Sequence, residues 1–155
     1  MRVVFDPADG RSPAEGAANL RIAKGAAATL ALLLGDAVQI GLTRRDARAL
    51  SYADRLAILA AYDLGVRVER GAAGVRLSTG AGSAAGALAG AIASAVRRET
   101  GQPCPVQREG HWKLLREAPS VVVYVSPGAQ REPNVLAGAV AAHLAAALSS
   151  WAEVG

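Results

Sequence analysis

The chain opens on Met1-Arg-Val-Val-Phe-Asp-Pro-Ala-Asp-Gly10, a short apolar strand that runs directly into a turn. Asp6 and Pro7 end the apolar run, and Gly10 suits the turn that follows. In α/β folds the catalytic or metal-binding groups stand at the carboxyl ends of the strands. The stretch therefore predicts an α/β fold in which Asp6–Gly10 border a functional site.

Composition favours one globular domain spanning residues 1–155. The length fits a single domain that buries about two-thirds of its extended surface. Apolar residues make up 52% and charged residues 19%, which excludes a disordered chain. Since only 4% of residues are aromatic, we expect a core of alanine, valine and leucine.

The net charge of +4 permits contact with anionic polymers. However, the arginines are scattered singly or in pairs, at Arg44-Arg45 and Arg97-Arg98, with no aromatic residues between them. This distribution is not typical of a nucleic-acid-binding protein.

Other sequence signals limit the class of protein. Cys104 is the only cysteine, so an internal disulfide and a cysteine-based zinc site are excluded. We find no signal-peptide pattern and no charge-free apolar run long enough to span a membrane. The localisation stays open: cytoplasmic as written, or extracytoplasmic if the domain was trimmed from a longer exported protein.

Strands and helices alternate along the chain, with a predicted loop at 11–19 and a predicted hairpin turn at Gly71–Gly74 between two alternating strands. The order βαβαββαβα predicts a three-layer α/β sandwich with a mixed central sheet and helices on both faces. The near-continuous apolar run Val121–Val123 predicts a strand buried on both faces. The predicted strands are 2–5, 38–43, 66–70, 75–79 and 120–125, and the predicted helices 20–34, 52–63, 83–99 and 134–150.

Several short motifs occur in the order found in one enzyme family. The chain resembles the zinc-dependent N-acetylmuramoyl-L-alanine amidases of the amidase-3 type, which cleave the bacterial cell wall. The matching pieces are the opening Asp6-Pro7, Lys24, Leu42-Thr43-Arg44 with Asp46, Leu50-Ser51 with Arg55, and Leu114-Leu115-Arg116 with Pro119.

The functional positions depart from the family. The resemblance places Asp9 and Glu69 where the family has its two zinc-binding histidines, and Ala23 where it has a zinc-binding glutamate. Tyr124 stands in place of the catalytic glutamate. Hydrolytic zinc needs imidazole and carboxylate ligands, and a base to deprotonate its water. The resemblance therefore implies a fold that has lost its zinc, its cofactor requirement and its catalytic residues.

Two interpretations follow. The preferred one is a catalytically inactive amidase-like domain, a pseudoenzyme that acts as a binding or regulatory module for a peptidoglycan fragment or a cell-wall protein. The alternative is a divergent metal-dependent hydrolase that uses Asp9 and Glu69 to hold Mg²⁺ or Mn²⁺. If the two carboxylates face each other without a cation, we expect Arg67 or Arg11 to pair with one of them.

The remaining polar and aromatic candidates have ordinary structural explanations. His111 lies near the expected cleft wall, and His143 lies in the last helix; both are expected to be structural. Trp112 and Trp151 are expected to pack rather than to bind sugar. Tyr124 is expected to close a buried strand with its hydroxyl at the rim.

Overall fold

The computed structural model describes residues 1–71, 74–77, 82–101, 103–108, 112–118, 121–126 and 132–154. Strands and helices alternate as the sequence predicted, but a strand at Val106–Arg108 and a short helix at Lys113–Glu117 were not predicted. In chain order they are β1 (Arg2–Pro7), α1 (Pro13–Leu34), a 3₁₀ turn (Gly35–Ala37), β2 (Gln39–Leu42), α2 (Tyr52–Ala60), β3 (Leu64–Val68), β4 (Gly74–Leu77), α3 (Ser83–Thr100), β5 (Val106–Arg108), α4 (Lys113–Glu117), β6 (Val121–Ser126) and α5 (Pro133–Val154).

The six strands form one mixed sheet in the order β2-β1-β3-β6-β4-β5. β2, β1, β3 and β6 are parallel to one another, whereas β4 pairs antiparallel with β6 and parallel with β5. The predicted central position of Val121–Val123 is confirmed, because β6 has a neighbour on each side and Val122 and Val123 are fully buried.

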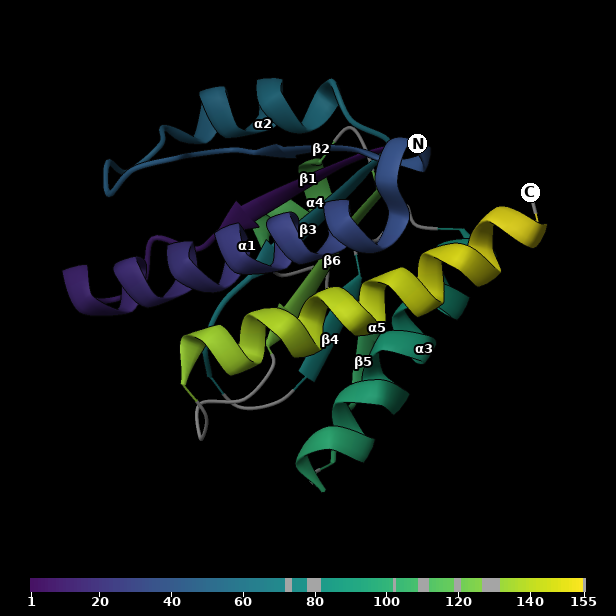
Figure 1. The fold of residues 1–155 in the computed structure, drawn as a ribbon. Coiled ribbons are helices and arrows are strands. Elements are labelled where there is room, and N and C mark those ends of the chain that lie inside the picture. Colours follow the sequence, from purple (N-terminus) through teal and green to yellow (C-terminus); the bar gives the residue numbers. More distant parts are fainter. Residues whose placement is uncertain are drawn as a thin grey trace.

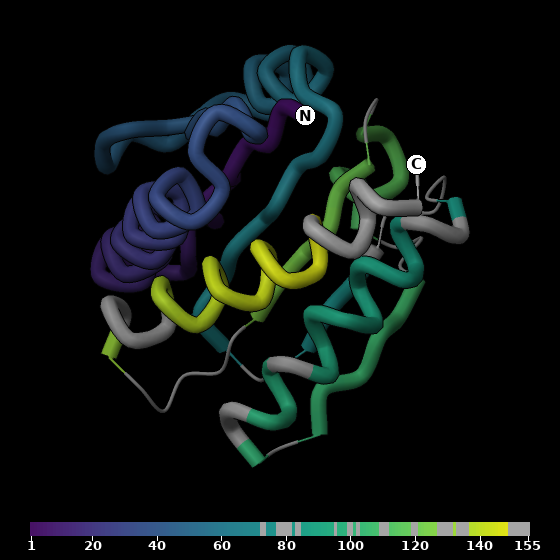
Figure 2. Tube along the Cα trace, turned by 45° about the vertical axis from the view of Figure 1, so that its right-hand side comes forward, coloured from purple at the N-terminus to yellow at the C-terminus, as the bar shows by residue number. Residues whose placement is uncertain are grey.

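Helices cover both faces of the sheet, so the predicted three-layer sandwich is confirmed. α1, α3 and α5 lie side by side on one face (Figures 1 and 2), where they enclose the larger core around Phe5, Val66 and Val123. α2 and α4 cover the other face and enclose a smaller core around Val4, Leu59 and Leu115.

The predicted hairpin between β3 and β4 is wrong. β6 lies between these two strands in the sheet, so β3 and β4 are not hydrogen-bonded neighbours. A strand as apolar as β6 needs partners on both edges, and this long-range demand outweighs the local turn signal.

The predicted loop over 11–19 is also wrong, because α1 begins at Pro13. Ser12 caps the helix by accepting a hydrogen bond from the Glu15 backbone N–H at 3.2 Å, and Pro13 occupies the first helical position. Ser51 caps α2 in the same way, by accepting a hydrogen bond from the Asp54 N–H at 3.1 Å.

One helical segment, Pro13–Ala37, is long and apolar enough to cross a membrane by length and composition alone, with a mean hydropathy of 1.3. The core helix of a globular domain satisfies the same criterion. Here the buried face of α1, which includes Ile22, Ala26 and Leu30, packs into the larger core.

Candidate functional site

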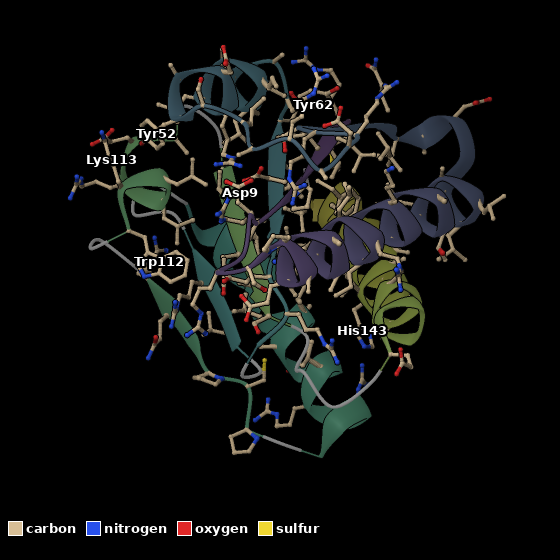
Figure 3. All side chains as sticks on the ribbon, turned by 90° about the vertical axis from the view of Figure 1, so that its left-hand side faces the viewer. Asp9, Tyr52, Tyr62, Trp112, Lys113 and His143 are labelled. Carbon is tan, nitrogen blue, oxygen red and sulfur yellow. The ribbon has the colours of Figure 1, made fainter. Side chains whose placement is uncertain are left out.

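A cleft of about 590 Å³ opens where the carboxyl ends of β3 and β6 meet the amino ends of β4 and β5. This is the edge of the sheet at which α/β folds place their ligands. Figure 3 looks onto the same edge and shows Asp9 and Trp112 on it. The cleft is lined by Arg11, Glu69, Arg70, Gly71, Gly74, Val75, Arg76, Pro105, Gln107, Trp112, Tyr124 and Ser126.

Next to this cleft, Asp6 forms a buried ion network. Asp6 is fully buried, and its Oδ1 accepts hydrogen bonds from Thr43 Oγ1 at 2.6 Å and Arg55 Nε at 2.9 Å. Arg67 Nη1 donates to the other oxygen. We call Asp6, Thr43, Arg55 and Arg67 the Asp6 network. Two guanidinium groups face one buried carboxylate, and a second carboxylate balances them.

That second carboxylate is Asp9. Arg55 Nη2 donates to both Asp9 oxygens, at 3.2 and 3.1 Å, and Arg44 Nε lies 3.5 Å from Oδ1. An arginine does pair with Asp9, as predicted, but the arginines are Arg55 and Arg44 and not Arg67 or Arg11. Arg67 pairs with Asp6 instead, and Arg11 lies 4.0 Å from Glu15.

Arg44 also fixes the backbone of the loop between β1 and α1. Its guanidinium donates to the carbonyl oxygens of Pro7, Ala8 and Gly16 at 3.3, 2.9 and 3.1 Å. Asn19 adds a fourth link, by donating to Ala8 O at 3.1 Å. The Asp9 loop is therefore tied to α1 by buried hydrogen bonds, which restricts its rearrangement around a ligand.

Glu69 has a different partner from Asp9. The Tyr124 hydroxyl donates to Glu69 Oε2 at 3.1 Å. Burial, together with the nearby Glu69 charge and this hydrogen bond, raises the pKa of Tyr124 well above its ordinary value. Tyr124 therefore keeps its proton at neutral pH and acts as a donor in the cleft.

Asp9 and Glu69 border different hollows. Glu69 lines the large cleft, whereas Asp9 borders a separate hollow of about 340 Å³ together with Gly10, Ser12 and Pro13. Only Arg11 borders both hollows among their described lining residues. Each carboxylate is instead held by its own partners, Asp9 by Arg55 and Arg44 and Glu69 by the Tyr124 hydroxyl.

Ala23 does not border the cleft either. It lies ten residues after the start of α1, about 15 Å along the helix, and is fully buried in the larger core. The acidic residue that α1 brings beside the Asp9 loop is Glu15: a Cβ added to Gly10 would lie 2.7 Å from Glu15 Cβ. The Glu15 carboxylate accepts the Arg11 backbone N–H at 2.7 Å.

The other candidates lie away from this site. His143 is half-buried on α5, in the layer on the far side of the sheet from Trp112 (Figure 3). Cys104 is buried, and burial raises the pKa of its thiol. His111 lies outside the described residues, as does the side chain of Trp151. Within the described residues, no group of three His, Cys, Asp or Glu side chains is placed to hold a metal ion.

The sequence prediction missed Arg76 and its aromatic partners. The Arg76 guanidinium carbon lies 4.6 Å from the centre of the Trp112 ring and 5.5 Å from that of Tyr124. The two rings meet edge to face at 4.8 Å. Alternation within Val75-Arg-Leu placed Arg76 and Val75 on opposite faces of the sheet, but only the position of β4 beside β6 brings Arg76 to Tyr124.

Comparison with solved structures identifies the architecture. The chain superposes on the catalytic domain of an N-acetylmuramoyl-L-alanine amidase from Bacillus (Paenibacillus) polymyxa with a TM-score of 0.71 and 18% identity, covering 100% of this chain and 99% of the other. An amidase of Nostoc punctiforme gives a TM-score of 0.73 at 18% identity, covering 96% and 97%. The chain has the amidase fold.

Further matches agree. An amidase from Clostridium difficile 630 gives a TM-score of 0.71 at 20% identity, covering 99% of this chain and 97% of the other. The CwlD amidase of Clostridioides difficile, solved in complex with the GerS lipoprotein, gives 0.66 at 15% identity and covers 99% of each chain. No family model matches the sequence, and no curated protein matches it. The amidase resemblance is thus confirmed at the level of the fold.

Proposed function

We propose that this chain is an amidase-fold domain that no longer hydrolyses amides and instead binds a peptidoglycan fragment or a cell-wall protein in its cleft. The observation that carries the proposal is the state of the two strand-end carboxylates. Asp9 is neutralised by Arg55 and Arg44, and Glu69 accepts the Tyr124 hydroxyl.

The residues present do not fit a hydrolytic zinc ion. Zinc favours nitrogen and sulfur donors beside a carboxylate, and needs three protein ligands around one open position. Asp9 would have to exchange two guanidinium contacts for the metal, and the buried cations next to it would repel a dication. Glu69 lines a different hollow and already accepts the Tyr124 hydroxyl, and Ala23 supplies no ligand atom.

The position that the resemblance assigns to the general base holds no base. Tyr124 stands where the amidase resemblance expects the catalytic glutamate, and its raised pKa keeps it protonated at neutral pH. A protonated phenol donates a hydrogen bond but does not deprotonate water. These two points weigh against the alternative of a divergent metal-dependent hydrolase that uses Asp9 and Glu69.

The class of ligand is proposed from the structural neighbours. The matched domains are named for N-acetylmuramoyl-L-alanine, and one of them was solved with a lipoprotein partner. A cleft of about 590 Å³ is of the size that holds a small ligand or several residues of a peptide. A soluble muropeptide is therefore the first ligand to test.

Isothermal titration calorimetry of the purified chain with a muropeptide tests this proposal. We expect saturable binding that a Gly74→Trp variant weakens at least tenfold, since Gly74 lines the cleft and has open space around its α-carbon. Gly90→Trp is the matched control, because Gly90 also has open space but lies on α3, outside the cleft lining. Equal binding by both variants, or no binding at all, would overturn the proposal.

A further inference from the structure

The large cleft is positively charged. Among its described lining residues, Arg11, Arg70 and Arg76 are basic and Glu69 is acidic. The chain as a whole carries 17 basic and 13 acidic residues, so the described cleft lining is more basic than the average surface. An anionic ligand would gain from this local excess.

Sheet register explains why Arg76 has no acidic partner among the residues that the structure describes. Asp6, Arg67, Tyr124 and Arg76 occupy paired positions on β1, β3, β6 and β4, and form one row across the sheet. Arg67 lies beside Asp6 and forms an ion pair with its carboxylate. Tyr124 stands next in the row and directs its hydroxyl to Glu69, so Arg76, which lies between Tyr124 and Gln107 of β5, meets aromatic rings instead.

These rings hold the Arg76 guanidinium without using its N–H groups. A guanidinium stacked on an aromatic face keeps its donors in the plane, available for a bidentate acceptor. None of the described residues accepts a hydrogen bond from the Arg76 side chain in this structure. By contrast, the guanidinium groups of Arg44, Arg55 and Arg67 each donate to a carboxylate or to backbone carbonyls.

We propose that Arg76 is a carboxylate-binding residue, and that the ligand of the cleft is an acidic peptide. A carboxylate matches the paired N–H groups of the guanidinium, and Arg11 and Arg70 at the same cleft attract the ligand's remaining negative charge. Glu69 lies in the same cleft and disfavours a doubly charged phosphate more than a singly charged carboxylate. This inference rests on the function proposed above and names the group that the site recognises.

The test compares two probes by titration calorimetry with the full chain: N-acetylmuramoyl-L-alanyl-D-glutamate and the same compound with both carboxylates converted to amides. We expect the acidic probe to bind at least tenfold more tightly. Arg76→Gln should weaken the acidic probe by about 10- to 100-fold, the usual effect of losing a hydrogen bond to a charged group, and should leave the diamide unchanged.

Two further variants separate charge from geometry. Arg76→Lys keeps the charge but loses the bidentate donor pair, so its affinity for the acidic probe should lie between those of the wild type and Arg76→Gln. Arg21→Gln removes the same charge from the exposed face of α1 and should have no effect. Circular dichroism confirms that each variant is folded.

The outcomes are distinguishable. Equal affinity for both probes would overturn the carboxylate site and leave the proposed function standing, and absence of binding by either probe would overturn both. Tighter binding of inorganic phosphate or of a single-stranded oligonucleotide than of the acidic probe would assign the basic cleft to a different ligand and would also overturn the inference.

Discussion

Charged residues on the two sides of β6, the strand that carries Tyr124, differ in whether they are paired. On the β1 side, the charges of the Asp6 network are all paired: Asp6 is fully buried between Arg55 and Arg67, and Asp9 pairs with Arg55. On the β4 side, Arg76 rests on aromatic rings and faces an open cleft. A closed network stabilises a fold, whereas a half-buried cation that lines a cleft is placed to meet a ligand. The proposed binding therefore belongs to the β4 side.

The largest expected effect comes from removing the central carboxylate of the Asp6 network. Asp6→Asn leaves Arg55 and Arg67 without their shared carboxylate, and an uncompensated buried charge costs about 3–5 kcal/mol of unfolding free energy. Chemical denaturation measures this loss. Asp63→Asn is the control, since its pair with Arg2 is exposed and should contribute far less. Similar losses for the two variants would contradict the special role of the Asp6 network.

A second change tests how tightly the loop that carries Asp9 packs against α1. A Cβ at Gly16 would lie 2.3 Å from the Asp9 carbonyl oxygen, so Gly16→Ala forces backbone movement and should cost about 1–3 kcal/mol. Gly90→Ala, in open space on α3, should instead raise stability by about 0.5–1 kcal/mol. Thermal unfolding of the pair checks both signs, and a neutral Gly16→Ala would mean that the Asp9 loop is not held against α1.

The smallest effect concerns the strand between the two sides. Because Tyr124 has a raised pKa, the unfolded chain loses this proton at lower pH than the folded chain does. The unfolded state then binds fewer protons, so stability falls as the pH rises above about 10. Tyr124→Phe should lower stability by about 1 kcal/mol at neutral pH, through loss of the bond to Glu69, and should make the alkaline decline shallower.

Thermal unfolding between pH 8 and 11 measures that decline. A second variant, Glu69→Gln, removes the charge and keeps the tyrosine, so the Tyr124 pKa should move toward its ordinary value while burial still keeps it raised. Absorbance titration of the phenolate reports the shift. An unchanged titration curve in Glu69→Gln would contradict the contact between these two groups.

The sequence alone was sufficient for the architecture but not for the site. The alternation of apolar strands and capped helices predicted the layers, and the apolar run of β6 predicted its central place. Sequence could not tell that β6 would separate β3 from β4, because strand order depends on long-range burial and not on local turn signals. For the same reason the sequence did not predict the contacts of Arg76. Its aromatic partners come from β6 and from the start of α4.

The ion pairs were missed for a related reason. Asp9 was expected to meet an arginine close in sequence or on the neighbouring strand, but its partners come from α2 and from the loop after β2. Arg44 and Arg55 were noted in the sequence as parts of matching motifs. Only the packing of α2 over β1 shows that they neutralise Asp9.

The central claim is that this amidase fold binds without cleaving, and one measurement tests it most directly. The purified chain is incubated with a muropeptide in buffer containing zinc, and the products are analysed by mass spectrometry while bound zinc is quantified after dialysis. We predict that the muropeptide remains intact and that zinc stays far below one ion per chain. Release of the peptide from muramic acid, abolished by a chelator and accompanied by stoichiometric zinc, would contradict the account.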